Sequence, residues 1–176
     1  MNPQPHEAVS LTSLIRRIAD DLAEAGTGAL AELRRLSPED PGGAAFWRIV
    51  VTRLDPEYLP GGGPARDDAL RRWAVILRAM ANLDGLHNLV HRLGTALAQA
   101  GVSELRLNKL LRVSGEPLFA EVRAVTHQLA TAAAAVDLTG IARLVLSDCQ
   151  PHEKAVRQTI ANDYYTQIFR AEKETD

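Results

Sequence analysis

Hydrophobic residues recur along most of the chain at the spacing of helices that bury one side. The clearest segment runs from residue 11 to residue 25 and follows the i, i+3, i+4, i+7 pattern of an amphipathic helix. Its apolar positions are Leu11, Leu14, Ile15, Ile18 and Leu22. Ser10 is a residue type that caps helix starts, and Gly26 is one that ends helices. The pattern therefore predicts a first helix between these two residues.

The same periodicity predicts a series of further helices joined by short links. A short second helix ends at Leu36, before Ser37-Pro38. The later predicted helices cover residues 44–54, 66–81, 86–100, 103–113, 116–135, 137–146 and 151–170. Residues 55–64 (DPEYLPGGGP) are rich in proline and glycine, which indicates a loop. In the helix 44–54, four apolar side chains are expected to face inward: Phe46, Trp47, Val50 and Val51.

No window alternates apolar and polar residues clearly enough to predict a β-strand. Alanine, leucine and arginine dominate the sequence, and these residue types favour helix. We therefore predict an all-α protein of two small helical bundles with about eight to nine helices. The break near Gly101 predicts an N-terminal helical bundle over residues 1–100 and a C-terminal helical bundle over residues 101–176.

Composition narrows the protein class. A hydrophobic fraction of 46% can fill a core, and the one cysteine, Cys149, excludes an internal disulfide, as is typical of a reducing compartment. The first ten residues, MNPQPHEAVS, lack the basic and apolar regions of a secretory signal. The longest uncharged run, residues 124–136, is too short and too polar to span a membrane. We expect a soluble cytoplasmic protein.

Positive charge is concentrated in one part of the chain. The formal net charge is −2, but residues 66–112 hold eight basic and four acidic side chains. Within that part, GVSELRLNKLLRVSGEP (101–117) places Arg106, Lys109 and Arg112 at steps of three on a predicted helix, opposite a leucine face. We call these three residues the basic ridge. It is either a solvated helix face or a phosphate-binding surface, and only Glu104 balances it nearby in sequence.

Adjacent arginines occur elsewhere, at residues 16–17, 34–35 and 71–72. Neighbouring residues on a helix point about 100° apart, so each pair can reach outward without burying both members. These pairs serve either solubility or phosphate contact. Because aromatic residues make up only 5% of the chain, a base-stacking surface is not expected. Any nucleic-acid contact would be with the backbone and nearly independent of base sequence.

Candidate catalytic and metal-binding groups are incomplete. His87 and His91 (DGLHNLVH) lie four apart on a predicted helical face, but no HExxH motif or second ligand cluster accompanies them. The GGGP stretch lacks the GK[ST] of a phosphate-binding P-loop. Cys149 and His152 lack an orienting third group. Trp47 and Trp73 are most simply core residues. We predict no enzyme, no cofactor and no metal site.

Three segments in the same order resemble one known family. They are GALAELRRLSPEDPGGAAFWRIV (28–50), LGTALAQAGVSELRLNKLLR (93–112) and DLTGIARLVLSDCQPHEKAVRQTIANDYYTQ (137–167). Together they are similar to the CasB family, the small or belly subunit of the type I-E CRISPR Cascade complex. Asp163, Tyr164 and Tyr165 form the DYY-type element of the last segment. No single motif is specific, but the three in this order are.

The resemblance implies a non-catalytic subunit in antiviral defence that binds both RNA and DNA. Its expected partners are the backbone and large Cascade subunits, the crRNA, the target DNA with its displaced strand, and a second copy packed head to tail. The implied roles are stabilising the crRNA–target hybrid and holding the displaced strand. Basic positions of the motifs fall on Arg34, Arg35, Arg48, Arg106, Arg112 and Arg157, with Arg66 and Arg123 between the motifs. Lys109 joins this set through the basic ridge.

Two positions depart from the expected family pattern. Thr95 and Asn162 stand where many relatives are expected to have a basic residue, which shortens the predicted C-terminal basic track. The alternative function is a helical protein–protein adaptor whose arginines only keep it soluble. A third is a metal-dependent hydrolase that uses His87 and His91. Salt-dependent binding of single-stranded DNA separates the first two, and metal analysis tests the third.

Overall fold

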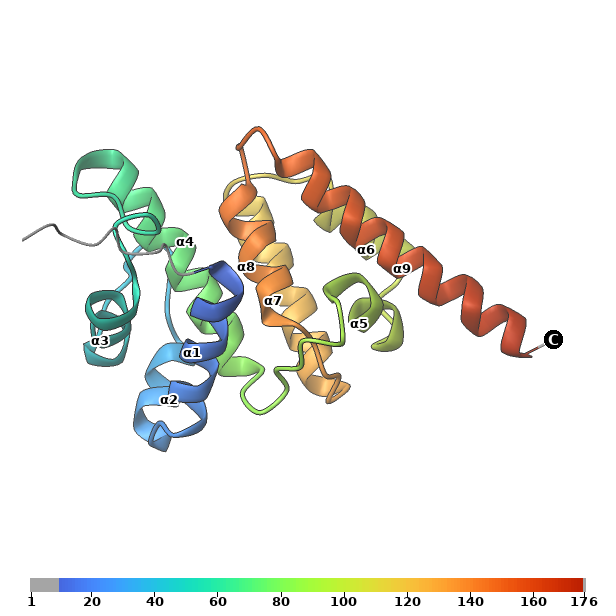
Figure 1. Cartoon of the computed structure of the whole chain (residues 1–176), viewed down its shortest axis with the longest axis horizontal. Helices are drawn as coiled ribbons and strands as arrows, with labels where there is room; N and C mark the ends of the chain where they lie inside the picture. The colour runs from blue at the N-terminus through green and yellow to red at the C-terminus, as the bar shows by residue number, and fades with distance from the viewer. Residues whose placement is uncertain (1–9, 176) are drawn as a thin grey trace, which may run out of the picture.

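The computed structural model describes residues 10–175, and helices account for its regular structure (Figure 1). The nine helices of this part are α1 (Leu11–Ala23), α2 (Thr27–Arg34), α3 (Ala44–Arg53), α4 (Gly63–Asn82), α5 (Leu93–Gln99), α6 (Glu104–Leu110), α7 (Glu116–Thr131), α8 (Leu138–Ser147) and α9 (Glu153–Thr175). No strand forms among these residues, although His87 and Val136 make one isolated bridge. The prediction of an all-α fold is confirmed. None of these helices is long and apolar enough to cross a membrane.

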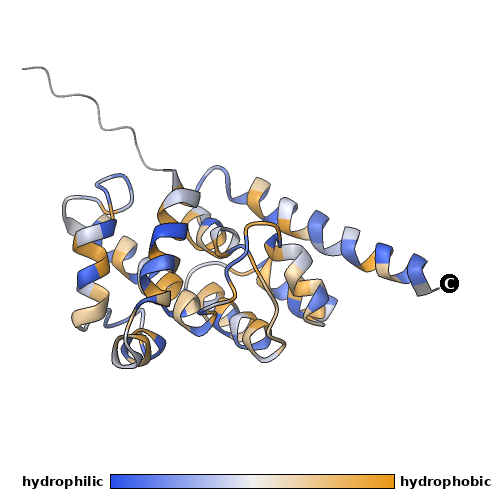
Figure 2. Cartoon of the chain, turned by 60° about the horizontal axis from the view of Figure 1, so that its bottom comes forward, coloured by the Kyte–Doolittle hydropathy of each residue, from blue (hydrophilic) through white to orange (hydrophobic). Residues whose placement is uncertain are grey.

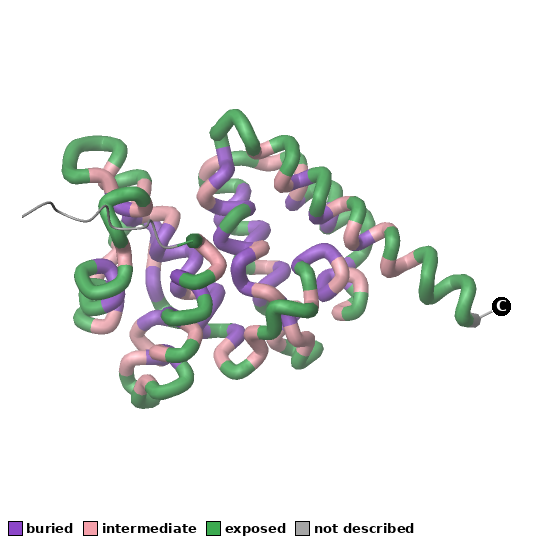
Figure 3. Tube along the Cα trace, in the orientation of Figure 1, coloured by how far each residue is buried: buried purple, intermediate pink, exposed green. Residues whose placement is uncertain are grey.

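The helices pack around one continuous set of buried apolar side chains. Helix α2 packs on α3 and α4, and α4 in turn contacts α7 and α8. Helix α5 packs along α9, whose C-terminal end projects beyond the other helices (Figures 1 and 3). The division into two bundles at Gly101 stays a prediction. Helix α5 lies before Gly101 in the chain, and its main packing partner, α9, lies after it. Contacts between helices therefore cross the predicted boundary.

Helix α1 shows how the sequence pattern becomes packing. The Ser10 hydroxyl accepts a hydrogen bond from the Ser13 N–H at 3.3 Å, which caps the first turn. The helix then buries Leu14, Ile15, Ile18 and Leu22, four of the five positions that the periodicity selected, while Leu11 is only half-buried. Apolar and polar residues both occur along the other helices (Figure 2).

The contact between α5 and α9 depends on a glycine. A Cβ placed at Gly94 would lie 2.2 Å from the Ile160 carbonyl oxygen and 2.8 Å from Asp163 Cβ. Only glycine therefore allows α5 to approach α9 this closely. Beside this contact, the buried Tyr164 hydroxyl donates a 2.6 Å hydrogen bond to the Val102 carbonyl. These two features fix α9 against the loop between α5 and α6.

Several predicted boundaries were wrong. The predicted helix 86–100 forms only at residues 93–99, because Gly85 adopts φ 77° and the chain leaves the helical path. Residues 86–88 instead bond to Val136, which donates to the Leu86 carbonyl at 2.9 Å and accepts from the Asn88 N–H at 3.0 Å. Helix α4 also begins at Gly63, inside the predicted loop.

Two side chains of α3 do not face the core as predicted. Trp47 is 41% exposed and Val51 is 77% exposed, whereas Phe46, Ile49 and Val50 are buried. Helix α3 packs mainly on α1 and α2, and its outer face stays exposed among the described residues, so the longer apolar stripe remains on the surface. The prediction for Trp73 is confirmed, since this side chain is fully buried and its indole N–H donates to the Tyr58 carbonyl at 3.0 Å.

Candidate nucleic-acid interface

The basic ridge lies on and just after α6. The Ser103 hydroxyl accepts from the Arg106 N–H at 3.3 Å and so caps this helix, as its sequence position suggests. Leu107 and Leu110 are buried on the opposite side. Arg106 and Arg112 are exposed, and neither side chain has a hydrogen-bond or ion-pair partner among residues 10–175. Their charged groups are therefore free to meet an external anion.

Lys109 differs from its two neighbours. Its Nζ pairs with Glu121 Oε1 at 2.5 Å, and the Glu121 side chain is mostly covered by the protein. The prediction that only Glu104 balances the ridge was therefore wrong. Glu121 is twelve residues away on α7, and its position becomes visible only when α6 and α7 pack together. Local sequence reasoning had no signal for this contact.

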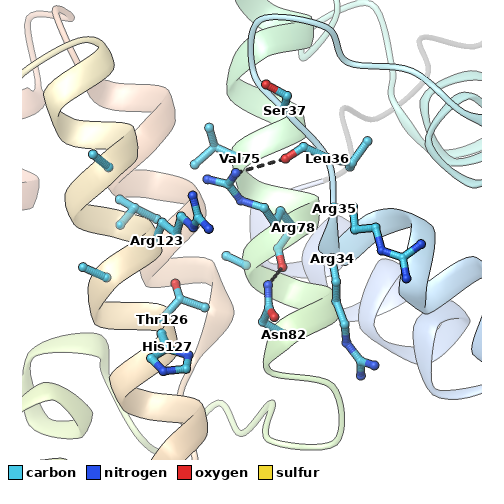
Figure 4. A pocket seen from close by; sticks show the side chains of 14 residues that line it. Arg34, Arg35, Leu36, Ser37, Val75, Arg78, Asn82, Arg123, Thr126 and His127 are labelled. Atoms are coloured by element: carbon cyan, nitrogen blue, oxygen red, sulfur yellow. Dashed lines mark hydrogen bonds between the residues drawn. The ribbon is translucent and has the colours of Figure 1, made fainter.

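A second basic surface lies in a groove between the end of α2, one face of α4 and one face of α7 (Figure 4). The cavity has a volume of about 770 Å³. Its cationic side chains are Arg34, Arg35, Arg78 and Arg123, with the imidazole of His127 beside them. None of the lining residues carries a carboxylate. We call this cavity the arginine groove.

The arginines of the groove are held mainly by neutral groups. Arg34 Nε donates to the Ala81 carbonyl at 2.9 Å, and Arg78 donates to the Leu36 carbonyl at 3.0 Å. Arg35 and Arg123 have no side-chain partner within the described chain. Because carbonyls do not neutralise a guanidinium charge, these arginines keep their positive charge, which is closest between Arg78 and Arg123, while Arg34 and Arg35 extend away from that pair (Figure 4).

The pKa of Arg78 reflects the positive charge around it. Burial lowers the pKa of the Arg78 guanidinium below its ordinary value, and the nearby charge of Arg123 lowers it further. Glu39, in the loop after α2, acts in the opposite direction. Arg78 still carries its charge at neutral pH, since arginine does not deprotonate in proteins. The groove therefore holds two like charges that an anion would stabilise.

The other predicted binding residues have separate environments. Arg48 is exposed on α3 and lines a different hollow between α1, α2 and α3. Arg66 is half-buried and donates to the Pro60 carbonyl at 3.0 Å, which holds the loop before α4. Neither residue lines the arginine groove, so the structure does not gather the predicted set into one site.

Arg157 is used inside the protein. It is 9% exposed, and its guanidinium meets Asp148 at 3.1 Å and Glu153 at 2.7 Å. It also donates to the Val113 carbonyl at 2.8 Å. Asp148 is fully buried and accepts the Gly115 N–H at 2.8 Å. This network joins α8, α9 and the link between α6 and α7, so we leave Arg157 out of the proposed binding surface.

The histidine pair does not have the predicted geometry. Residues 86–92 are not helical, so His87 and His91 do not share a helical face. His87 Nδ1 accepts a hydrogen bond from the Leu138 N–H at 3.3 Å. Its Nε2 is buried and has no hydrogen-bond partner among the described residues. Within residues 10–175, no group of three or more histidine, cysteine or acidic side chains could hold a metal ion.

The comparison with protein families decides the relationship. A family model described as CRISPR-associated protein Cse2 matches residues 29–165, more than three quarters of the chain. The chain belongs to the Cse2 family. Cse2 and CasB denote the same family, so the resemblance seen in the sequence is confirmed. Neither the curated proteins nor the solved structures that were searched gave a match.

Membership in the Cse2 family gives the chain its setting. The family is a structural component of the CRISPR Cascade complex, which makes this chain a Cascade small subunit with other Cascade subunits as partners. The matched region contains α3 to α8, most of α2 and the first half of α9. The arginine groove and the basic ridge both lie within it. The end of α9, with Phe169, lies beyond it.

Proposed function

We propose that this Cse2-family chain is a non-catalytic Cascade subunit that binds the backbone of nucleic acids. In the complex it stabilises the crRNA–target hybrid and holds the displaced strand. The observation that carries this proposal is the arginine groove. Four arginines line it, and none of its lining residues has a carboxylate. Membership in a family of structural subunits supports the absence of a catalytic role.

The chemistry of the groove and the ridge suits phosphates. Guanidinium groups form short, charge-assisted hydrogen bonds with phosphate oxygens, and these contacts position a strand without reading its bases. Arg35, Arg106 and Arg123 are not neutralised by a described acidic side chain. An overall charge of −2 does not oppose this role. Salt screens charges that lie farther apart than the Debye length of roughly 8–10 Å, so distant acidic side chains do little to weaken a local basic surface.

We also propose that a second copy packs head to tail. Exposed apolar side chains lie at opposite ends of the longest axis: Trp47 and Val51 on α3, and Phe169, 59% exposed, on α9 (Figure 1). Two different surfaces at opposite ends produce a heterologous contact. Changing Phe169→Ser and Val51→Ser should each weaken self-association in sedimentation experiments while leaving the melting temperature nearly unchanged, because both side chains are mostly exposed. A dimer unaffected by both changes would contradict this arrangement.

The alternative function is a protein–protein adaptor. In that case the exposed apolar residues would contact partner proteins, and the arginines would only keep the chain soluble. A salt titration of single-strand binding separates the two functions, because only phosphate contacts release counterions. The informative variant is Arg106→Ala with Arg112→Ala. The control, Arg170→Ala with Lys173→Ala, removes the same charge from the exposed end of α9.

The experiment begins by co-purifying the chain with the other Cascade subunits and a crRNA, and then measures strand binding at several salt concentrations. For the ridge variant we expect weaker binding and a log–log slope lower by about 0.7 per lost phosphate contact. The control should retain the wild-type slope. Equal slopes and affinities for wild type and ridge variant would reject phosphate binding by the ridge. A ridge variant that fails to join the complex would favour the adaptor.

A further inference from the structure

One buried hydroxyl in the arginine groove has no partner. Thr126 is 2% exposed, and its Oγ1 has no hydrogen-bond partner among the described residues. Thr126 lies one helical turn after Arg123 on α7, and both residues line the groove. A threonine in a helix populates two rotamers, so its hydroxyl can turn toward a group that enters the groove. Buried polar groups are normally satisfied, and this exception requires an explanation.

Two guanidinium groups approach each other beside this hydroxyl. Figure 4 shows Arg78 extending from α4 and Arg123 extending from α7 toward the same space. Their proximity is also seen in the pKa of Arg78, which the charge of Arg123 lowers. Like charges that face each other repel, and Glu39 offsets this repulsion only from outside the lining of the groove, so an anion between the two arginines would relieve it. The groove thus has a charge arrangement that suits an anion.

The floor of the groove leaves room for a ligand. Small side chains line the facing helices: Ala79 on α4, and Ala120 and Ala124 on α7. The volume of about 770 Å³ is that of a small-molecule pocket and holds one or two nucleotides. A flexible single strand can bend a phosphate into a hollow of this size, whereas a stiff duplex carries its phosphates on a wide outer surface. The size of the groove therefore favours a single strand.

We propose that the arginine groove holds a phosphate of a single nucleic-acid strand between Arg78 and Arg123, with the Thr126 hydroxyl as a further donor. This inference rests on the proposed nucleic-acid function and assigns one site to it. Bound there, the strand links α4 to α7, which belong to opposite sides of the groove. Arg78 and Thr126 gain roles that the sequence motifs did not suggest.

Two substitutions test the site in the full chain. Arg123→Ala removes an exposed charge that has no partner in the described chain, so the fold should be preserved. Thr126→Val keeps the shape and removes only the hydroxyl. The control Arg170→Ala removes one exposed charge from α9, outside the groove. Arg78 is not changed, because its bond to the Leu36 carbonyl supports the structure.

The measurement is a salt titration with a fluorescent oligo-dT strand and, separately, with a duplex of the same length. We expect Arg123→Ala to weaken strand binding about tenfold and to lower the slope by about 0.7, with a smaller effect on the duplex. Thr126→Val should weaken strand binding several-fold without changing the slope, because it removes no charge. It should also raise the melting temperature slightly, since an unsatisfied hydroxyl is gone.

The outcomes separate this site from the general function. The site is rejected if either variant binds the strand like Arg170→Ala, or if Arg123→Ala weakens duplex and strand equally. If the Arg106 and Arg112 variant still loses affinity in that case, the proposed function survives and only the groove assignment fails. If the wild-type chain binds no strand, both proposals fail.

Discussion

Replacing Arg157 with alanine separates a structural arginine from a binding arginine. Family position places Arg157 among the basic residues of the motifs, whereas the structure surrounds its guanidinium with Asp148, Glu153 and two main-chain carbonyls. Arg157→Ala would leave the buried Asp148 carboxylate with the Gly115 N–H and with Arg72, whose nearest nitrogen is 4.0 Å away. The variant should therefore lose stability first.

The size of this loss follows from the burial of both partners. Asp148 is fully buried, and the Arg157 side chain is about nine-tenths covered. Breaking a buried ion pair by removing one partner costs about 3–5 kcal/mol, because the other charge remains uncompensated. For a chain of this length, each kcal/mol lowers the melting temperature by about 2–4 °C. The expected decrease is roughly 6–20 °C.

The assay is thermal unfolding followed by circular dichroism, with reversible urea unfolding as a second measure. Lys154→Ala, an exposed change three residues earlier on α9, is the matched control and should shift the melting temperature by less than about 1 °C. Arg157→Met with Asp148→Asn should recover part of the loss, because position 148 then no longer holds a fully buried carboxylate without its Arg157 partner. A melting temperature for Arg157→Ala within about 2 °C of wild type would refute this reasoning.

Four smaller predictions follow from local geometry. Gly94→Ala should lower the free energy of unfolding by about 3 kcal/mol in urea titrations, because its Cβ meets the α9 backbone, and wild-type stability would refute the close contact. Gly28→Ala, where a Cβ meets nothing within 4 Å, should instead raise it by about 0.5–1 kcal/mol. Ser103→Ala should cost about 1 kcal/mol by removing the α6 cap. Burial, followed by the charge of Glu104, raises the pKa of Tyr164. The neutral hydroxyl therefore contributes its full stabilisation below pH 10.0, the ordinary tyrosine value, and this contribution is lost as pH rises through the folded pKa. In unfolding experiments at increasing pH, the free energy of unfolding should fall more steeply for wild type than for Tyr164→Phe.

The fold was predictable where local signals decide the structure. The periodicity of α1 and the caps at Ser10 and Ser103 needed only residues a few positions apart. The predicted helix 86–100 failed because a glycine with positive φ and a bridge to Val136 overrode its apolar spacing. That bridge joins segments about fifty residues apart, so no local window contains it.

The candidate site was predictable only in part. The sequence identified Arg34, Arg35 and Arg123, but it gave no reason to place them around one cavity with Arg78. The Lys109–Glu121 pair and the buried position of Arg157 likewise depend on how distant helices pack. Charge patterns along a sequence indicate which residues can bind phosphate, and tertiary packing decides which of them remain free to do so.

The most direct test of the central claim is target binding by reconstituted Cascade as a function of salt. Complexes that contain the wild-type chain, a chain with Arg106, Arg112 and Arg123 changed to alanine, or no small subunit are compared on the same target DNA. We expect tight binding with a steep slope for wild type, and weaker binding with a lower slope for a triple variant that still assembles. An assembled triple variant with the wild-type affinity and slope would contradict the claim that this subunit holds nucleic acid through these arginines.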